Sequence, residues 1–282
     1  MIKTYDRETL SKLQSVELQI FKDFAEVCKK YNLQYFTIGG TTIGAVRHGG
    51  FIPWDDDIDV CMLRSDYDKF KEIVPKEFEG KYRFCDFENT DRFMLVFGKL
   101  EKIGTKFVSL TNDGGRTDTG IFLDIFPFDK TPMDEAKRKK QIKHALLWCK
   151  AYVLCHTGNP HVPGSGIKTS LYKLACKAAH IALCAIPKKA LRAKYMKWAT
   201  MYNNSNEPCF ITDFSTLNPE LFALTADDYL PAVEMPFEDT VICVPRNYHL
   251  ALTRQFGDYM MLPPEDKRIN HHPDILDFGD GE

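Results

Sequence analysis

The sequence predicts an α+β fold, in which a strand-rich first half is followed by a helical second half. β-rich and alternating segments gather between residues 33 and 126, and from about 134 to 204 the pattern is mainly helical. Strands followed by helices, rather than alternating with them, are typical of this fold class. The 282 residues, 44% of them hydrophobic, can bury the core of one large domain or of two small ones.

Residues 7–31 are predicted to form an amphipathic helix that Asn32 ends. Apolar residues recur there every three or four positions and would make one buried stripe. They are Leu10, Leu13, Val16, Ile20, Phe24 and Val27.

A strand, a tight turn and a short helix are predicted next. The β-rich segment 33–38 runs into Gly39-Gly40, and a helix is expected over Thr41–Arg47. Further on, residues 57–60 alternate between polar and apolar, which is the pattern of a strand.

The remaining elements follow from similar patterns and from turn residues. We expect a helix over Ser65–Ile73 with Ser65 as N-cap, strands at Tyr82–Phe87, Phe93–Leu100, Phe107–Leu110, Ile121–Phe126 and Thr240–Val244, and a last helix over Arg246–Phe256 that Gly257 ends. The helical region is interrupted at Asn159–Gly166. Its apolar segment Ala175–Pro187 is too short for a membrane span, so we interpret it as a buried helix.

Charge and cysteine content exclude some classes of protein. The formal net charge of −2 gives no electrostatic reason to expect nucleic-acid binding. Two segments are basic, Lys137–Lys143 and Lys188–Lys197, and each fits either a solvated helix face or a site facing anionic lipid or an anionic polymer. The nine cysteines form no Cys-x-x-Cys pair, which favours reduced thiols in a cytosolic protein over zinc sites or disulfides.

The aspartates of Gly50-Phe-Ile-Pro-Trp-Asp-Asp-Asp-Ile-Asp-Val60 indicate the chemistry. Asp57 and Asp59 stand two residues apart on a predicted strand, so both carboxylates point to one face while Ile58 points to the other. Two carboxylates this close repel each other unless a divalent cation lies between them, and oxygen ligands suit Mg²⁺ or Mn²⁺. The pair is therefore predicted to bind a metal and, through it, phosphate groups.

A third carboxylate is expected from Asp124, which lies among large apolar residues on a later strand. A charge buried there needs a partner. Both a metal and a strand-end contact with backbone amides remain open for Asp124. Asp55 and Asp56 are expected to orient the loop or to position the metal ligands without binding the metal themselves.

The Gly39-Gly40 turn would let backbone N–H groups approach phosphate oxygens. Such turns are common, but this one shortly precedes the aspartates, so the two features are complementary parts of one site. Arg47 offers a fork of donors to phosphate. Lys99 is either a second phosphate contact or a solvated lysine at a strand end.

The run Gly39-Gly-Thr-Thr-Ile-Gly-Ala-Val-Arg-His-Gly-Gly-Phe-Ile-Pro-Trp-Asp-Asp-Asp-Ile-Asp-Val60 closely resembles the LicD family of phosphocholine transferases. That family is related to the fukutin-type transferases and belongs to the nucleotidyltransferase superfamily. The superfamily pattern is a Gly-Gly or Gly-Ser turn, then Asp-h-Asp-h and later h-Asp-h, where h is apolar. Gly39-Gly40, Asp57-Ile-Asp59-Val and Leu123-Asp124-Ile match this pattern.

The resemblance covers residues 10–275 and is vaguest at 140–240. Further matching segments are Phe97-Gly-Lys99 with Thr105, the segments 120–129 and 256–268, and His271-His272. Thr42 departs from the family, whose members often carry Leu there, without touching the predicted ligands.

The resemblance implies a nucleotidyltransferase-like mixed sheet with flanking helices, and a helical C-terminal half. Residues 1–133 would be the catalytic core, and residues 134–282 a mainly helical region that completes the same domain. The implied reaction is metal-dependent transfer of a phospho-alcohol, typically phosphocholine from CDP-choline, to a hydroxyl of a cell-surface glycan, with release of CMP. Fukutin-type relatives use CDP-ribitol instead.

The implied acceptor is a glycan or a lipid-linked glycan, such as a teichoic-acid or lipopolysaccharide sugar. The cysteine content favours the cytoplasm, and peripheral contact at the inner face of the membrane is a further expectation. Two other functions stay open: a nucleotidyltransferase that releases pyrophosphate, and an inactive scaffold that binds glycans. The complete set of superfamily carboxylates argues against the scaffold.

The resemblance also assigns roles to residues. The expected catalytic and metal-binding residues are Asp57, Asp59 and Asp124, with Asp124 also a candidate base. The expected phosphate and nucleotide contacts are Gly39, Gly40, Thr41, Arg47 and Lys99. Candidates for acceptor contact or for support of the ligands are Trp54, Asp55, His48, His271 and His272. Trp54 either packs in the core or belongs to an aromatic cage for choline.

Overall fold

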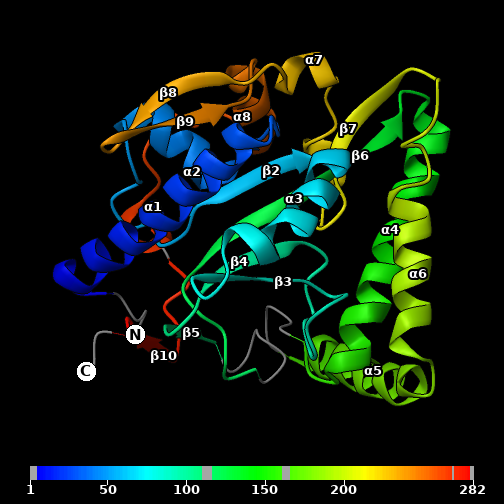
Figure 1. The fold of residues 1–282 in the computed structure, drawn as a ribbon. Coiled ribbons are helices and arrows are strands. Elements are labelled where there is room, and N and C mark those ends of the chain that lie inside the picture. The colour runs from blue at the N-terminus through cyan, green and yellow to red at the C-terminus, as the bar shows by residue number, and fades with distance from the viewer. Residues whose placement is uncertain (1–4, 110–115, 161–165, 269, 280–282) are drawn as a thin grey trace.

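The computed structural model describes residues 5–109, 116–160, 166–268 and 270–279. Its centre is a six-stranded mixed sheet in the order β1-β2-β6-β4-β3, in which β7 pairs with β6 (Figure 1). The strands of this sheet are β1 (Phe36–Thr37), β2 (Asp59–Leu63), β3 (Tyr82–Cys85), β4 (Gly98–Lys102), β6 (Phe122–Pro132) and β7 (Cys209–Asp213). Two small antiparallel pairs lie apart from it: β5 (Lys106–Val108) with β10 (Ile275–Asp277), and β8 (Val233–Phe237) with β9 (Thr240–Val244).

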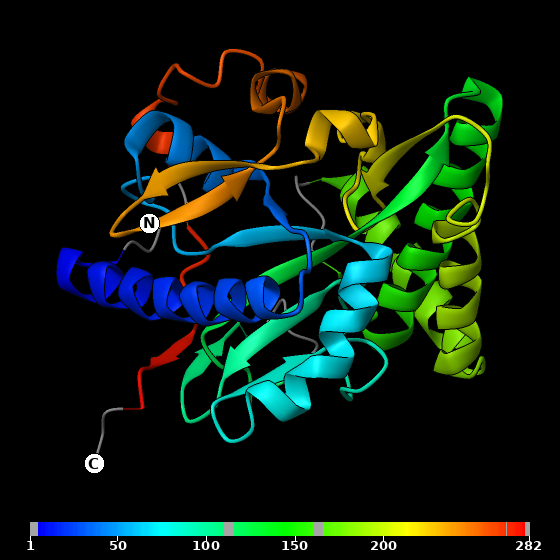
Figure 2. The same cartoon turned by 45° about the horizontal axis from the view of Figure 1, so that its top comes forward.

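The helices cover both faces of the sheet and extend beyond one end of it. They are α1 (Arg7–Lys30), α2 (Gly39–Ile43), α3 (Arg64–Glu77), α4 (Glu135–His156), α5 (Ile167–Cys184), α6 (Lys188–Ala199), α7 (Ala226–Tyr229) and α8 (Tyr248–Phe256). A π-helical turn (Gly44–His48) follows α2, and 3-10 turns lie at Pro219–Leu221 and Glu265–Lys267. In Figure 2, α1 and α3 lie in front of the sheet, and α4 to α6 form a separate arm at its right.

Helix α1 forms as the sequence predicts, because it has an N-cap and one apolar stripe. The Asp6 carboxylate accepts a hydrogen bond from the Thr9 backbone N–H at 2.8 Å. Leu13, Ile20 and Phe24 of the stripe are fully buried in the same core cluster as Val60 of β2, while Val16 is half-buried against it. Each such side chain contributes about 1.5–3 kcal/mol through burial. This packing fixes one face of the sheet and leaves the other face for the polar residues of β2.

Several predicted boundaries are wrong because tertiary pairing overrides local pattern. Helix α3 begins at Arg64 after Leu63, so Ser65 is not the N-cap and makes no capping hydrogen bond. Strand β4 begins only at Gly98; Phe93 instead packs in a second core cluster with residues of α4 and α6. Strand β6 extends to Pro132 because β7 pairs with its second half.

The other predicted elements differ by a few residues. Helix α2 includes both glycines instead of following them, and Gly257 follows α8 with a φ of +68° as predicted. The region after residue 205, where the sequence predicted one strand and one helix, also contributes β7, α7, β8 and β10. Leu110, at the end of one predicted strand, lies outside the described residues.

The interpretation of Ala175–Pro187 as a buried helix is wrong. This segment forms the end of α5 and the turn after it, and Cys176 is the residue of α5 that is buried. No helix in the described ranges has the length and apolar character needed to cross a membrane.

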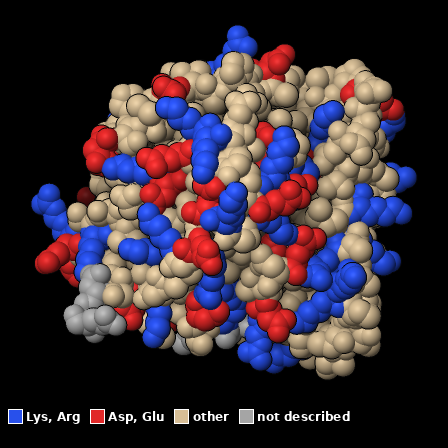
Figure 3. All heavy atoms as spheres, in the orientation of Figure 1, with Lys and Arg blue, Asp and Glu red and all other residues tan. Residues whose placement is uncertain are grey.

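All nine cysteines are free, as the sequence predicted. On the face shown in Figure 3, charges of both signs mix over the centre, while blue and tan prevail at the lower right, where the arm lies.

Candidate active site

Three adjacent strands place Asp59, Asp124 and Lys99 in one row across the sheet. Asp59 of β2 is the Cα partner of Asp124 in the parallel β2–β6 pair. Asp124 is in turn the partner of Lys99 in the antiparallel β6–β4 pair. Partners in register point to the same face, so the row forms on the face opposite α1. The sequence predicted the aspartates but not this register.

Asp57 joins the row through the alternation that the sequence predicted. Strand β2 begins at Asp59, and Asp57 lies in the extended segment before it. Ile58 and Val60 are fully buried on the opposite side, while Asp57 and Asp59 are half-buried. The Ile58 carbonyl accepts a hydrogen bond from the Asp124 backbone N–H at 3.1 Å, which holds the two segments together. The carboxylates of Asp57 and Asp59 therefore share one face.

The Gly39-Gly40 turn lies against these aspartates. Gly39 has a φ of +58°, which other residues rarely adopt. A Cβ on Gly40 would stand 2.5 Å from the Asp55 Oδ2, so any other residue there would force the Asp55 carboxylate to move. The Thr41 hydroxyl accepts a hydrogen bond from the Asp59 backbone N–H at 2.8 Å. The turn and the aspartates are thus parts of one site, as predicted.

Burial and mutual repulsion raise the pKa values of these carboxyl groups. Burial, followed by the charges of Asp57 and Asp56, raises the pKa of Asp55 to about 8. Burial raises the pKa of Asp57 to about 6, and burial together with Asp57 and Asp124 raises that of Asp59 well above its usual value. The cations near these carboxyl groups therefore do not fully compensate the negative charge that the groups carry when ionised.

Asp124 and Lys99 form a nearly buried ion pair, with 2.7 Å between the Lys99 Nζ and the Asp124 Oδ1. Burial raises the pKa of Asp124, and the charge of Lys99 opposes this effect. The Lys99 Nζ also lies 3.2 Å from the centre of the Phe122 ring. Lys99 is therefore a partner of an aspartate in this structure and not a solvated strand-end lysine.

The donor set suits a hard divalent cation, because it consists of carboxylates that repel one another. Within the described ranges, however, no three His, Cys, Asp or Glu side chains are already arranged around a common metal position. Asp124 faces Lys99, and the Asp57 Oδ2 lies 3.6 Å from the His271 Nδ1. Binding a metal would require these side chains to turn away from their cations.

Arg47 has a structural partner as well as a place beside the site. Its Nη1 donates hydrogen bonds to the carbonyls of Tyr259 at 2.6 Å and Met261 at 3.3 Å, and its Nε donates to the His48 ring. His48 itself is exposed. Arg47 therefore attaches the segment after α8 to the glycine turn and leaves His48 at the rim.

A cavity of about 390 Å³ opens next to Gly40 and Asp55. Trp54, Phe256 and Tyr259 supply aromatic rings to its lining. The Arg268 guanidinium lies 4.9 Å from the centre of the Trp54 ring, so this ring already attracts one cation. Trp54 also packs against a small apolar cluster. Trp54 therefore packs in part and lines this cavity, and its role in an aromatic cage for choline stays a prediction.

Asp56 is fully buried and attaches the C-terminal segment to the aspartate loop. It accepts hydrogen bonds from the Tyr5 hydroxyl at 2.8 Å and from the backbone N–H groups of His271 and His272. Although burial alone raises its pKa, the hydrogen bonds from His271 lower it below the usual value. The same contact raises the pKa of the exposed His271 to about 9. Asp56 therefore holds both histidines of the C-terminal segment next to the aspartate loop.

Glu17 is a carboxyl group of this site that sequence reasoning missed. It is fully buried on α1, and neither of its carboxyl oxygens has a hydrogen-bond partner among the described residues. Burial, then Asp57 and Asp56, raises its pKa well above the usual value. The signal was present, since Glu17 interrupts the apolar stripe between Leu13 and Ile20. Nearby, the Gln14 side chain donates a hydrogen bond to the Asp55 carbonyl at 2.8 Å.

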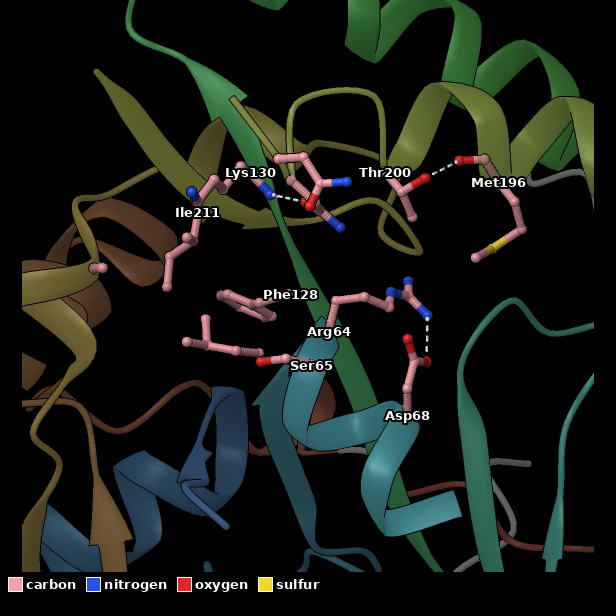
Figure 4. Close-up of a pocket in the computed structure, with 12 residues that line it drawn as sticks. Arg64, Ser65, Asp68, Phe128, Lys130, Met196, Thr200 and Ile211 are labelled. Atoms are coloured by element: carbon pink, nitrogen blue, oxygen red, sulfur yellow. Dashed lines mark hydrogen bonds and ion pairs between the residues drawn. The ribbon is translucent and has the colours of Figure 1, made fainter. Parts of the chain in front are cut away.

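A larger cavity of about 570 Å³ lies farther along the same sheet face (Figure 4). Leu63 and Phe128, four residues beyond Asp59 and Asp124 on their strands, line its floor. Figure 4 shows Arg64 extending toward Asp68, with Met196 of α6 and Thr200, which follows α6, on the opposite side. The sequence did not single out this cavity, because its walls come from segments far apart in the chain.

Comparison with known proteins identifies the family. Residues 32–154 match the model of the LicD/FKTN/FKRP nucleotidyltransferase domain. The chain is 30% identical over 277 residues to the lipopolysaccharide cholinephosphotransferase LicD of Haemophilus influenzae, covering 94% of this chain and 96% of that protein. A protein from Rickettsia typhi is 38% identical over 132 residues, 44% of this chain and 41% of its own. Together with the register of Asp59 and Asp124, this shows that the chain belongs to the LicD family.

Proposed function

We propose that the protein transfers a phospho-alcohol, with phosphocholine as the first choice, from a CDP-linked donor to a hydroxyl of a cell-surface glycan or its precursor. CMP leaves in the reaction. The observation that carries this proposal is the row of Asp59, Asp124 and Lys99 beside the glycine turn. The Haemophilus relative, named as a lipopolysaccharide cholinephosphotransferase, aligns along nearly the whole chain and supports the choice of cargo and acceptor.

Asp57, Asp59 and Asp124 would hold a Mg²⁺ or Mn²⁺ ion, which neutralises the charge of the donor's diphosphate. Asp124 takes the proton from the acceptor hydroxyl as its oxygen attacks the phosphorus of the phospho-alcohol. The bond from this phosphorus to the CMP oxygen breaks. Lys99, which Asp124 would leave on turning to the metal, would be free to stabilise charge on the phosphate oxygens.

The aromatic cavity beside Gly40 is the proposed place for the choline group. A quaternary ammonium is attracted by ring faces, and Trp54, Phe256 and Tyr259 provide them. Asp55 at the rim adds a carboxyl group that a bound cation would keep ionised. A ribitol or glycerol group would gain less there, because it carries no positive charge.

The larger cavity is the proposed place for a distant part of the acceptor. It lies on the same face of the sheet as the aspartates, about 13 Å along β2 and β6 at the usual rise of a strand. Its polar lining includes Ser65 and Asn204, together with Phe128. Hydroxyl-rich sugars bind through such a mixture of polar groups and ring faces.

A donor screen tests the proposed function. Purified protein with Mg²⁺ is incubated with a glycan acceptor and, in turn, CDP-choline, CDP-ribitol, CDP-glycerol, CDP-ethanolamine and CTP. We expect CMP release that is fastest with CDP-choline and that EDTA abolishes. Release of pyrophosphate from CTP would instead favour a nucleotidyltransferase. This is the alternative function, because the matching domain is described as a nucleotidyltransferase domain.

Binding measurements distinguish an inactive protein from a missing acceptor. Calorimetric titration with CDP-choline in Mg²⁺ requires no acceptor, so it should give heat even where no CMP is released. Absence of binding to every donor and to the metal would contradict the proposed function and leave the glycan-binding scaffold.

A further inference from the structure

Helix α5 presents an apolar stripe to solvent instead of to the core. The stripe alternates steps of four and three residues, so its members lie within about 40° of one line along the helix. Its members are Ile167, Leu171, Leu174, Ala178, Ile181 and Ala185 at the C-cap, and all are exposed. Ile167 is 82% exposed and Ile181 is 73% exposed.

The opposite side of α5 holds the helix in place. Cys176, which lies about 180° around the helix from the stripe, is buried. The His180 Nδ1 is 2.6 Å from the Leu154 carbonyl on α4, and the Cys184 thiol donates to the Cys155 carbonyl. The helix is therefore fixed with its apolar stripe outward.

Lysines flank the stripe on both sides. Lys168 lies about 100° from its centre in one direction, and Lys177 and Lys173 lie about 80–120° in the other. Long lysine side chains in such positions can extend toward phosphate groups while the stripe enters an apolar layer. An apolar stripe flanked by lysines is the pattern of a helix that lies in the interface of a bilayer.

Beyond Glu135, the first residue of α4, the arm has charge of one sign. Residues 136–206 contain fourteen Lys and Arg and no Asp or Glu, whereas the full chain has 37 basic and 39 acidic residues. In the lower right of Figure 3, the arm accordingly shows blue and tan surface. A surface of anionic lipid carries the charge opposite to that of the arm, and it attracts such basic segments.

We propose that α5, with the basic arm α4–α6 behind it, docks the protein on the surface of a bilayer rich in anionic lipid. The stripe enters the boundary between headgroups and acyl chains, and the flanking lysines contact lipid phosphates. A second copy of the chain is a poorer occupant, because two such arms would bring like charges together. Docking requires neither donor nor acceptor, so it is tested separately from the transfer reaction.

Co-sedimentation with vesicles tests the docking. Full-length protein is mixed with vesicles of phosphatidylglycerol and phosphatidylcholine, or of phosphatidylcholine alone, at low and high salt. We expect binding to the anionic vesicles that high salt weakens. Replacing Lys168, Lys173 and Lys177 by Gln should weaken it on the order of a hundredfold, since each lysine near the surface contributes about fivefold. Leu171→Gln, Leu174→Gln and Ile181→Gln together should weaken it at least about tenfold.

Matched variants control for net charge and for exposed apolar residues. Lys29→Gln, Lys76→Gln and Lys106→Gln change the net charge equally at exposed positions outside the arm. Leu217→Gln removes an apolar side chain that is 82% exposed elsewhere. Both controls should bind like the unchanged protein.

Three outcomes would overturn the proposal. The first is equal binding to neutral and anionic vesicles, and the second is an equal loss in the lysine control. The third is a dimer in sedimentation velocity that the stripe substitutions dissociate while vesicle binding stays unchanged. This last result would assign the stripe to an interface between copies of the chain.

Discussion

The aspartate site and the helical arm both concentrate charge of one sign, but they differ in burial. At the site, Asp57, Asp59 and Asp124 are half-buried or buried side chains whose pKa values are raised, and their charges also raise the pKa of the buried Glu17. On the arm, the basic side chains are mostly exposed on α4 to α6. Buried like charges cost free energy unless a partner compensates them, whereas solvated like charges cost little.

This difference assigns the two regions different kinds of partner. The buried carboxylates need a cation in direct contact, such as Lys99 now or a metal during catalysis. The solvated lysines act over a longer range and are weakened by salt. Substitutions at the site should therefore change chemistry and stability, and substitutions of the exposed lysines of the arm should change only association with a surface.

Asp59→Asn should give the largest effect. Loss of one carboxylate of the proposed metal site removes several kcal/mol of transition-state stabilisation, so CMP release should fall on the order of a thousandfold. Steady-state kinetics with CDP-choline measures the loss, and circular dichroism checks the fold. Asp227→Asn on exposed α7 and Lys177→Gln on the arm should leave turnover unchanged. A fully active Asp59→Asn protein would remove Asp59 from the mechanism.

Lys99→Met should give the next largest effect, on stability. It leaves the nearly buried Asp124 without its cation, which costs about 3 kcal/mol in comparable buried pairs. Urea unfolding in EDTA at pH 8 measures the change. The loss should shrink as the pH falls, because burial raises the pKa of Asp124 and, without the charge of Lys99, its carboxyl takes up a proton more readily. Lys189→Met on the arm should stay within about 0.5 kcal/mol; an equal loss there would contradict the contrast between the two regions.

The pH dependence of stability should give a smaller effect of defined sign. Acids whose pKa is raised in the folded state, such as Asp57 at about 6 and Asp55 at about 8, hold protons that the unfolded chain has lost. His271, at about 9, adds stability below pH 6.5 that disappears as pH rises through 9. Both contributions make the metal-free protein less stable as pH rises from 5 to 9.

Thermal unfolding in EDTA measures this slope, and Mg²⁺ should flatten it by compensating the ionised carboxylates. The control is the arm triple Lys168→Gln, Lys173→Gln and Lys177→Gln, which should leave the slope unchanged. A midpoint that rises with pH would contradict the raised pKa values.

Much of the site was predictable because its local geometry is fixed by neighbours in the chain. The alternation of Asp57 and Asp59 with Ile58 sets which side chains share a face, and only glycine suits position 39 with its positive φ. The boundaries of α3 and β6 were less predictable. They depend on partners from distant segments, such as β7 for the end of β6.

The residues that were missed or left open have distant partners. Lys99 could be read as solvated because the sequence does not give the register that pairs it with Asp124. Asp56 received a minor role, although it binds His271 from the far end of the chain. Glu17 was overlooked because an isolated acidic residue in an apolar stripe has no visible partner until α1 packs beside the aspartate loop.

By itself, the sequence determined the α+β class, the amphipathic α1, the glycine turn and the shared face of Asp57 and Asp59, because each follows from periodicity or from one residue's allowed backbone. Only the tertiary structure decided that Asp124 lies opposite Asp59 and that the stripe of α5 faces solvent. Periodicity specifies which side chains lie together on a helix or strand. What that face contacts depends on the packing of segments that are remote in the chain.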